Sequence, residues 1–343
     1  MKLKGINYDI GIAFTYGDPE STTNVWNKEA FRRDLEIIRD ELGCNAMRLS
    51  GTDETDMICG AEMVLQAGMD CWVSPHYIDA PLEELEARTQ AVAAGVEPLR
   101  AKYPDNEVVI VYGCELHHFS PFLPGSNFTE RLQILGSPDL PGLLEEANKK
   151  LDAYFARVIP EMRKVFGGRI TYTTVFFEQI DWAPFDIICL DHYKNNSTKD
   201  SFRDDMASFV QLAAAQNKEF YCLETGYGCF DGCFAVAGAN NMAVGITAEG
   251  LLDRDVARSE KQQADALVDA MEDIFQTGAG GIFVFTFVNS NLPHSEEQRR
   301  DLDMVGYSIT KTWADGRPGS VYDGVSWDPK EAFYALKEFN RTH

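Results

Sequence analysis

Eight short apolar runs, separated by longer amphipathic stretches, constrain the fold of this chain more than any other feature. Several runs are nearly continuous and rich in Val, Ile, Phe and Tyr, as expected of strands that are buried on both faces. The runs are Leu3–Ile10, Ala46–Ser50, Cys71–His76, Val108–Glu115, Ile170–Phe177, Ile187–Tyr193, Phe220–Glu224 and Gly281–Val288.

The stretches between the runs have the spacing of amphipathic helices. In Asn27–Leu42, for example, apolar side chains recur every three or four residues. A second helix is expected to open at Pro81, with acidic residues in its first turns, where the helix dipole favours them. Further helices are predicted over Leu143–Phe166, Val256–Phe275 and Pro329–Asn340.

Strands that alternate with helices indicate an α/β fold with a parallel sheet. Eight is the number of strands that closes a parallel barrel, so we predict a single (β/α)8 barrel (TIM barrel) domain over residues 1–343. The connection Glu178–Asp186 is too short for a full helix. Two long connections, residues 225–255 and 290–328, follow the seventh and eighth runs. In a barrel such loops lie over the catalytic face.

Charge and composition narrow the partners of the chain. With 54 acidic and 31 basic residues, the formal net charge is −23, which disfavours nucleic acid and anionic membrane surfaces as partners. No run of about 18 apolar residues predicts a membrane span, and the first residues lack the pattern of a signal peptide. Four of the eight cysteines lie in apolar runs and are expected to be buried thiols, namely Cys71, Cys114, Cys189 and Cys222. We therefore predict a reduced, cytoplasmic protein.

One pair of cysteines stands apart from the apolar runs. Cys229 and Cys233 form a C-x3-C pair in a predicted loop. A redox or metal-binding role for this pair is left open, as is whether the two thiols form a disulfide.

Polar residues gather where the predicted strands end. In a parallel barrel these carboxyl ends converge on one mouth, and a charge at the end of an apolar strand is usually solvated, paired or functional. The residues concerned are Arg48, His76, Glu115, His117, Glu178, Asp191, Tyr193, Glu224 and Asn289.

Glu115 and Glu224 are the predicted catalytic pair. If both side chains point inward, they face each other across the mouth, and two carboxylates in that setting suit glycosidic chemistry. One with a raised pKa would protonate the leaving oxygen, while the other stays ionised and attacks the anomeric carbon. Arg48 would keep a nearby carboxylate charged, and Tyr193 could donate a hydrogen bond to it.

The remaining polar and aromatic residues have alternative roles. His76, Asp191 and Asn289 are predicted to contact substrate. His117 is predicted either to contact substrate or to lie on a loop surface, and Trp182 either to stack on a sugar ring or to pack in the core. Glu178 and Asp181 are expected to cap the short fifth crossover.

Short motifs along the barrel resemble those of the retaining glycoside hydrolases of clan A. These motifs are Gly5-Ile6-Asn7 in the first strand, Met47-Arg48-Leu49 in the second, Gly113-Cys114-Glu115 in the fourth, Asp191-His192-Tyr193 in the sixth and Leu223-Glu224-Thr225-Gly226 in the seventh. The resemblance implies that Glu115 is the acid/base and Glu224 the nucleophile. Cys114 stands where the clan has Asn, Asp191 stands where many members have His, and the Trp of the eighth strand is missing.

The end of the chain has a different resemblance. The segments Phe283–Phe287, Asp301–Met304 and Trp327–Lys330 are similar to those of bacterial proteins labelled as abortive phage infection proteins. That likeness implies a defence-related role without implying a particular chemistry.

These observations lead to a hypothesis and several alternatives. We predict a retaining glycosidase that acts on a small or unusual glycoside or an oligosaccharide, without cofactor or metal. One alternative is a metal-dependent barrel enzyme whose ligands come from His76, His117, Asp191, His192 and Glu224. Others are a lyase, cyclase or isomerase that uses the same two glutamates, and a non-catalytic sugar-binding or phage-defence scaffold. The oligomeric state is not specified by the sequence.

Overall fold

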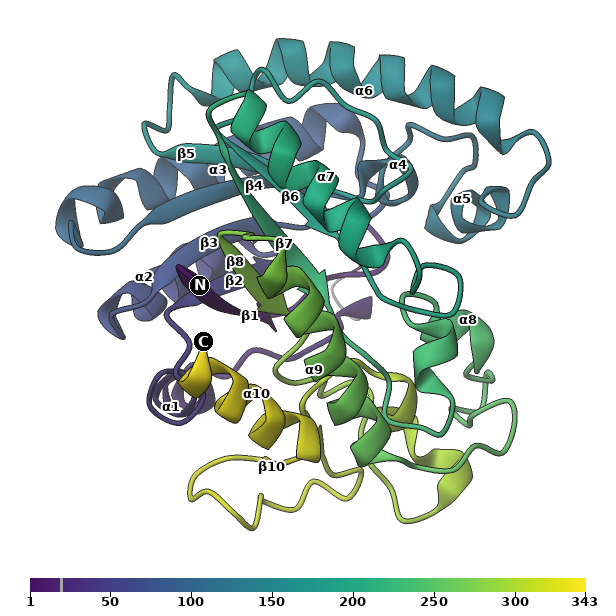
Figure 1. Cartoon of the computed structure of the whole chain (residues 1–343). Coiled ribbons are helices and arrows are strands. Elements are labelled where there is room, and N and C mark those ends of the chain that lie inside the picture. Colours follow the sequence, from purple (N-terminus) through teal and green to yellow (C-terminus); the bar gives the residue numbers. More distant parts are fainter. Residues whose placement is uncertain (19–20) are drawn as a thin grey trace.

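Eight parallel strands close into a barrel in the computed structural model, which describes residues 1–18 and 21–343 (Figure 1). Each strand pairs with its neighbours in chain order, and β8 pairs with β1 to complete the ring. The predicted (β/α)8 fold is therefore confirmed. The strands are β1 (Leu3–Asp9), β2 (Ala46–Gly51), β3 (Asp70–Pro75), β4 (Val108–Cys114), β5 (Arg169–Thr174), β6 (Ile187–Asp191), β7 (Glu219–Thr225) and β8 (Gly281–Val284).

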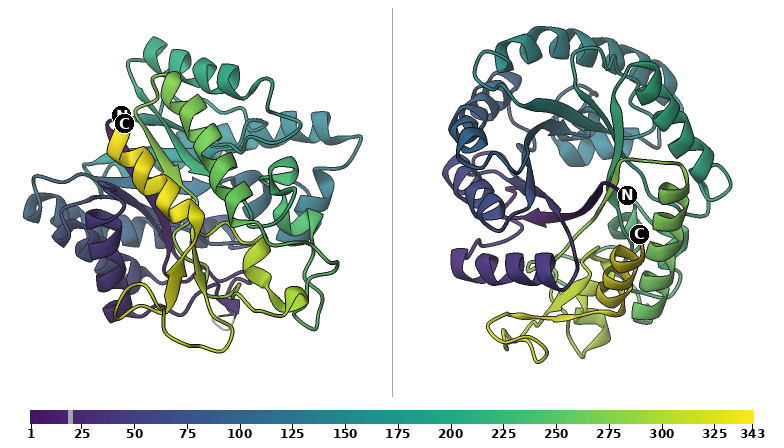
Figure 2. Two further views of the ribbon diagram at one scale, coloured as in Figure 1. Left: turned by 60° about the horizontal axis from the view of Figure 1, so that its bottom comes forward. Right: turned by 60° about the vertical axis from the view of Figure 1, so that its left-hand side comes forward.

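Helices surround the barrel, as the right-hand view of Figure 2 shows. Those that were predicted are present, with bounds shifted by a few residues, and α2 and α7 complete the alternation. The helices are α1 (Lys28–Asp40), α2 (Glu54–Gln66), α3 (Leu82–Lys102), α4 (Leu116–Phe119), α5 (Phe128–Ile134), α6 (Leu140–Met162), α7 (Phe202–Ala215), α8 (Asn240–Ala243), α9 (Glu260–Gln276) and α10 (Glu331–Thr342).

Helix α1 shows why these segments adopt the structure that their pattern predicts. The side chain of Asn27 accepts hydrogen bonds from the backbone N–H groups of residues 29 and 30, which otherwise lack partners at a helix start. Phe31, Leu35 and Ile38 then point from one face of the helix into the core and are at most 2% exposed.

Alternation along each strand divides the core into two parts. One set of apolar side chains lies between the strands and the helices, and a smaller set fills the inside of the barrel. The inside set comprises Leu3, Ala46, Trp72, Val109, Val111, Ile187, Cys189, Tyr221, Leu223 and Phe283. Gly5 leaves room for the ring of Phe283, because a Cβ atom there would lie only 2.3 Å from it. The interior is thus a packed core and not a pore.

The connections after β5 and β8 differ in character from the rest. No helix lies between β5 and β6 in the described structure, as expected from the short crossover. Two predicted strands are too long, since β5 ends at Thr174 instead of Phe177 and β8 at Val284 instead of Val288. At both places the chain leaves the barrel wall before its apolar run ends and carries aromatic side chains into the loops above the strands.

The long loops after β7 and β8 are fastened to each other. Arg258 in the first pairs with Asp301 and Asp303 in the second, and Lys330 pairs with Asp303 at 3.0 Å. The second loop also contains a short antiparallel ribbon of β9 (Thr310–Thr312) and β10 (Trp327–Pro329). These buried ion pairs give the loops a defined shape over the barrel.

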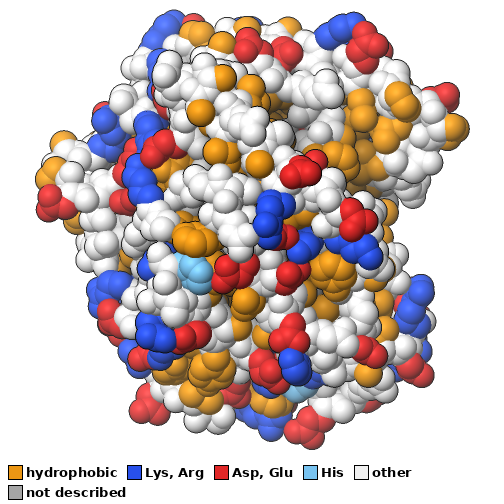
Figure 3. Space-filling model, viewed as in Figure 1, with side chains coloured by type: hydrophobic (Ala, Val, Ile, Leu, Met, Phe, Trp, Pro, Cys, Tyr) orange, Lys and Arg blue, Asp and Glu red, His pale blue; other side chains and the backbone are white. Residues whose placement is uncertain are grey.

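The position of the chain ends and the charge of the surface are two further features of the fold. The two chain ends lie side by side, and the amino group of Met1 donates a hydrogen bond to the backbone oxygen of His343 (Figure 2). Acidic and basic side chains are interspersed over the face shown in Figure 3. Within the described residues, no helix combines the length and the apolar character needed to cross a membrane.

Candidate active site

Glu224 lies at the carboxyl end of β7 and is held through both of its oxygen atoms. Arg48 Nη1 donates to Oε1 at 2.6 Å, and the hydroxyl of Tyr193 donates to Oε2 at 2.7 Å. The pairing register shifts on both sides of β7 near this point, so Glu224 lies opposite Asp191. The guanidinium and the phenol together fix the orientation of this carboxyl group.

Arg48 occupies the inside of the barrel because of the alternation along β2. Ala46 is part of the interior core, and Arg48 two residues later points to the same side. Its guanidinium is almost completely buried and also donates to Ser74 Oγ at 3.2 Å. Asn7, which shares this layer, donates from Nδ2 to the backbone oxygen of Leu223 at 2.8 Å and so ties β1 to β7. The same two-residue alternation could have identified Asn7 and Ser74 from the sequence.

Glu115 is positioned by an unusual turn at the end of β4. Gly113 has φ +86°, and Glu115 itself has φ +45°, a left-handed conformation that costs energy for a residue with a side chain. Burial, followed by the charge of Glu224, raises the pKa of Glu115 to about 8, although Arg48 acts in the opposite direction. The turn therefore holds a carboxyl group that stays protonated at neutral pH.

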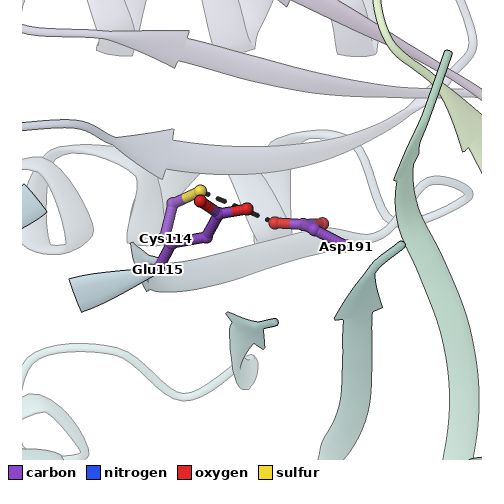
Figure 4. A group of neighbouring side chains, drawn as sticks. All are labelled: Cys114, Glu115 and Asp191. Carbon is purple, nitrogen blue, oxygen red and sulfur yellow. Dashed lines mark hydrogen bonds between the residues drawn. The ribbon is translucent and has the colours of Figure 1, made fainter. Parts of the chain in front are cut away.

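Asp191 lies at the end of β6, where it contacts Cys114, Thr173 and Arg48. Its Oδ1 accepts a hydrogen bond from Thr173 at 2.6 Å, and its Oδ2 accepts one from the Cys114 thiol at 3.6 Å. Arg48 Nη1 is 3.9 Å from Oδ1. Burial and the charge of Glu224 raise the pKa of Asp191 well above its usual range. Cys114 and Asp191, two of the three departures from the clan A pattern, are thus direct partners (Figure 4).

His118 is a site residue that the sequence analysis did not single out. Its Nε2 lies 2.6 Å from Glu115 Oε2, and burial lowers the pKa of its ring to about 4. Its neighbour His117, which was predicted to contact substrate, is fully buried on the other side of the turn, with Nδ1 3.8 Å from Glu178. The prediction that His117 contacts substrate or lies on a loop surface is wrong, because its side chain is fully buried. The left-handed turn at Glu115 ends the strand, so the direction of the side chains that follow cannot be read from strand alternation.

Glu178 supports the turn that carries Glu115. It accepts hydrogen bonds from the backbone N–H of His117 at 2.9 Å and from the hydroxyl of Tyr172 at 2.7 Å. The same Tyr172 oxygen accepts from the N–H of Leu116. Glu178 was predicted to cap the fifth crossover, and its Oε2 does accept from the hydroxyl of Thr174 at 3.0 Å, where that crossover begins. Its bond from His117 gives it a second role that was not predicted, because it satisfies one of the first N–H groups of α4. The predicted role of Asp181 also fits, since its Oδ1 accepts from the N–H of Ala183 within that crossover.

Two other predicted residues lie beside this group. His76 packs edge-on against Phe119, and burial together with the charges of Arg48 and His118 lowers its pKa to about 3. Tyr193 packs against Tyr307, which comes from the loop after β8. The charges of Glu224 and Glu115 contribute to the raised pKa of Tyr307, so this tyrosine also faces the site.

Trp182 and Asn289 are not brought into contact with the two glutamates. The backbone oxygen of Trp182 accepts from Lys218, which precedes β7, so Trp182 lies at the opposite end of the barrel. It is 4% exposed and packs on Phe185, and the proposed sugar platform is therefore wrong. Asn289 lies five residues beyond β8, and its buried Oδ1 has no hydrogen-bond partner among the described residues.

A cation site could be built from one group of side chains in the described structure. Ligand atoms of Cys114, Glu115 and Asp191 all lie within 4.8 Å of one another (Figure 4). The buried guanidinium of Arg48 already supplies positive charge next to Asp191, which opposes a divalent ion there. The histidines proposed as ligands do not join this group, since His192 stacks on Phe202 and lies 3.5 Å from Asp205.

The pair Cys229 and Cys233 carries free thiols. Both side chains are buried, and burial raises the pKa of Cys229 to about 12 and that of Cys233 to about 11. Neither thiol is therefore activated as a thiolate at neutral pH.

Several solved structures with the same architecture carry the names of glycoside hydrolases. A GH113 beta-1,4-mannanase superposes with a TM-score of 0.60 at 12% identity, and 99% of each chain is covered. The GH113 beta-mannanase of Alicyclobacillus acidocaldarius, in complex with ManMIm, gives a TM-score of 0.61 at 13% identity over 99% of this chain and 97% of that one. The chain also matches 49% of a b-glucuronidase from Ruminococcus gnavus, with a TM-score of 0.58 and 14% identity.

The chain has the fold of these barrels. No protein-family model matches the sequence, and no curated protein matches it either. These likenesses show the (β/α)8 fold alone. The resemblance of the barrel motifs to clan A and that of the tail to abortive phage infection proteins both stay predictions.

Proposed function

We propose that the protein is a retaining glycoside hydrolase with Glu224 as nucleophile and Glu115 as acid/base. The observation that carries the proposal is the contrast between the two carboxyl groups. Arg48 and Tyr193 each donate to one oxygen of Glu224, whereas burial raises the pKa of Glu115 to about 8. A nucleophile held in place by two donors and an acid that keeps its proton at neutral pH are what this chemistry requires.

The reaction would proceed in two steps. Glu224 attacks the anomeric carbon, and the bond to the leaving oxygen breaks as Glu115 donates its proton to that oxygen. Glu115, now a carboxylate, then takes a proton from water, whose oxygen attacks the anomeric carbon and releases Glu224. The side chain of Cys114 lies near both carboxyl groups. Its Sγ is 4.0 Å from Glu224 Oε1 and within 4.8 Å of a Glu115 oxygen.

A mechanism-based label tests the assignment directly. The protein is incubated with 2-deoxy-2-fluoro glycosyl fluorides of mannose, glucose, galactose and glucuronic acid, and its peptides are analysed by mass spectrometry. We expect one of these sugars to become attached to Glu224. The Glu224→Gln variant should remain unlabelled, and Glu115→Gln should hydrolyse aryl glycosides far more slowly than the wild type.

A matched control separates chemistry from a general effect of substitution. Glu146 lies on α6 and its side chain is 67% exposed, so Glu146→Gln should retain both labelling and turnover. Full turnover by Glu115→Gln or Glu224→Gln on a confirmed substrate would overturn the proposal. Activity that disappears with a stoichiometric divalent ion on dialysis against a chelator would favour a metal-dependent enzyme instead.

A further inference from the structure

One groove of the described structure is lined by residues that the mechanism described above does not use. It has a volume of about 650 Å³, within the range of pockets that hold small ligands. Its walls come from the loop after β1, the connection after β3 and the start of α5. The residues that line it are Phe14, Thr15, Asp79, Asn127, Phe128, Thr129 and Glu130.

Aromatic rings connect the groove to Glu115. Phe14 and Phe128 face the groove with their centroids 6.5 Å apart, and Phe128 stacks on Phe119 at 5.0 Å. The ring of His118 lies 4.6 Å from that of Phe119, and its Nε2 contacts Glu115. The groove is therefore linked to the acid/base residue through the packed rings of Phe119 and His118, which lie between Phe128 and Glu115.

A buried arginine gives this groove a fixed geometry. Arg131 is 1% exposed, pairs with Asp79 and donates from Nε to the backbone oxygen of His118 at 2.8 Å. Asp79 in turn accepts from the N–H of Phe128 at 3.0 Å. The wall that carries Phe128 and the turn that carries His118 are thus held by the same two charged side chains.

The position of the groove determines which part of a substrate it meets. The nucleophile attacks the anomeric carbon from the face opposite the leaving group, while the acid must contact the leaving oxygen. The leaving group therefore extends away from Glu224 on the side of Glu115, and the groove lies on that side.

The chemistry of the walls indicates the kind of ligand. Aromatic faces suit the apolar face of a sugar ring, and the side chains of Thr15, Asn127 and Thr129 offer partners for its hydroxyl groups. The charge of Asp79 is matched by Arg131, and Glu130 adds a negative charge at the rim. This arrangement suits an uncharged ligand and disfavours an acidic one.

We propose that the groove formed by Phe14 and Phe128 binds a neutral sugar residue on the leaving-group side of the cleaved bond. The proposal rests on the proposed glycosidase function and makes it more specific. The preferred substrates are then neutral oligosaccharides, and glycosides with a small leaving group are poorer ones.

Substitution of Phe14 tests this proposal, because Phe14 is 46% exposed and its truncation spares the core. For each variant, kcat/KM is measured on a neutral oligosaccharide and on the glycosyl fluoride of the same sugar, which has no ring on the leaving-group side. Phe14→Ala should lower the ratio of the two values by about threefold to tenfold, the usual size of an aromatic contact. Phe14→Tyr, which keeps an aromatic ring, should retain the wild-type ratio. Tyr334→Ala is the matched control, since Tyr334 on α10 is an aromatic residue of similar exposure (48%) far from the groove, and it should leave the ratio unchanged.

The possible outcomes separate this proposal from the proposed function. Turnover by the wild type with an unchanged ratio in Phe14→Ala would overturn the groove and leave the glycosidase assignment standing. A preference for oligosaccharides with an acidic leaving sugar would also overturn it. If no glycoside is hydrolysed, the glycosidase assignment fails, and calorimetric titration with neutral β-linked manno- and gluco-oligosaccharides still tests the groove. Binding that Phe14→Ala weakens and Tyr334→Ala does not would support it, whereas equal binding or none would overturn it.

Discussion

His118 Nε2 lies 2.6 Å from Oε2 of Glu115, so the imidazole contacts one of the two oxygen atoms of the acid. Because burial lowers the pKa of His118 to about 4 and raises that of Glu115 to about 8, both groups are neutral between these pH values. A neutral histidine that donates its Nε2 proton to Oε2 would direct the carboxyl proton of Glu115 to Oε1. His118 would then be a positioning residue for the acid.

Replacement of His118 should change the pH dependence of activity and not only its size. A donor to Oε2 stabilises the ionised form of Glu115, so its removal in His118→Ala should raise the pKa of Glu115 further. The alkaline limb of the pH profile of kcat/KM should move to higher pH by about half a unit to one unit. His118→Gln, which retains an N–H donor, should move it less. An alkaline limb that stays in place in both variants would contradict the positioning role.

Glu115 should make the stability of the protein depend on pH in a defined window. The pKa of this carboxyl is about 8 in the folded state against an ordinary value of 4.5, so the folded state holds the proton more tightly. Its contribution to stability is fully present below about pH 4.5 and is lost as the pH rises through 8. Glu115→Gln cannot ionise and should gain stability over the wild type across this window.

Chemical denaturation at several pH values measures this effect. The difference in unfolding free energy between Glu115→Gln and the wild type should be small near pH 4.5 and reach a few kcal/mol, in order of magnitude, near pH 8. Glu146→Gln serves as the exposed control and should show no such trend. A difference that is constant with pH would show that Glu115 titrates normally.

Loss of the Arg48 charge should destabilise the fold more than a surface substitution does. Arg48 is 1% exposed and lies between Glu224 and Asp191, so Arg48→Met leaves buried carboxyl groups without their counter-ion. The expected loss is about 3–5 kcal/mol of unfolding free energy, measured by urea denaturation. The double variant Arg48→Met/Glu224→Gln should recover part of that loss, because the neutralised side chain no longer needs the cation. Additive losses would contradict a direct interaction.

The cysteines provide a test of the redox state. All eight are free thiols, and Cys59 is the least buried of them. A thiol reagent without reductant should therefore modify Cys59 first in the native protein and all eight cysteines after unfolding in denaturant. Two thiols missing from the unfolded protein, located by mass spectrometry to Cys229 and Cys233, would show instead that this pair forms a disulfide.

Local patterns in the sequence determined the barrel and the identity of its central charged residues. Eight apolar runs with helical stretches between them specify a closed parallel sheet, and alternation along β2 places Arg48 inside it. Because the carboxyl ends of parallel strands meet at one mouth, Glu224, Asp191 and Tyr193 could be predicted to lie together from their positions alone. Their observed contacts with Arg48 and with one another agree with that prediction.

Only the tertiary structure decided how the remaining side chains are oriented. The left-handed turn at Glu115 brings His118, and not His117, to the acid, and the register shift beside β7 directs Glu224 toward Asp191. Trp182 lies at the far end of the barrel because the crossover after β5 runs back to the start of β6. Such turns and shifts depend on packing between segments far apart in the chain, so no local periodicity encodes them.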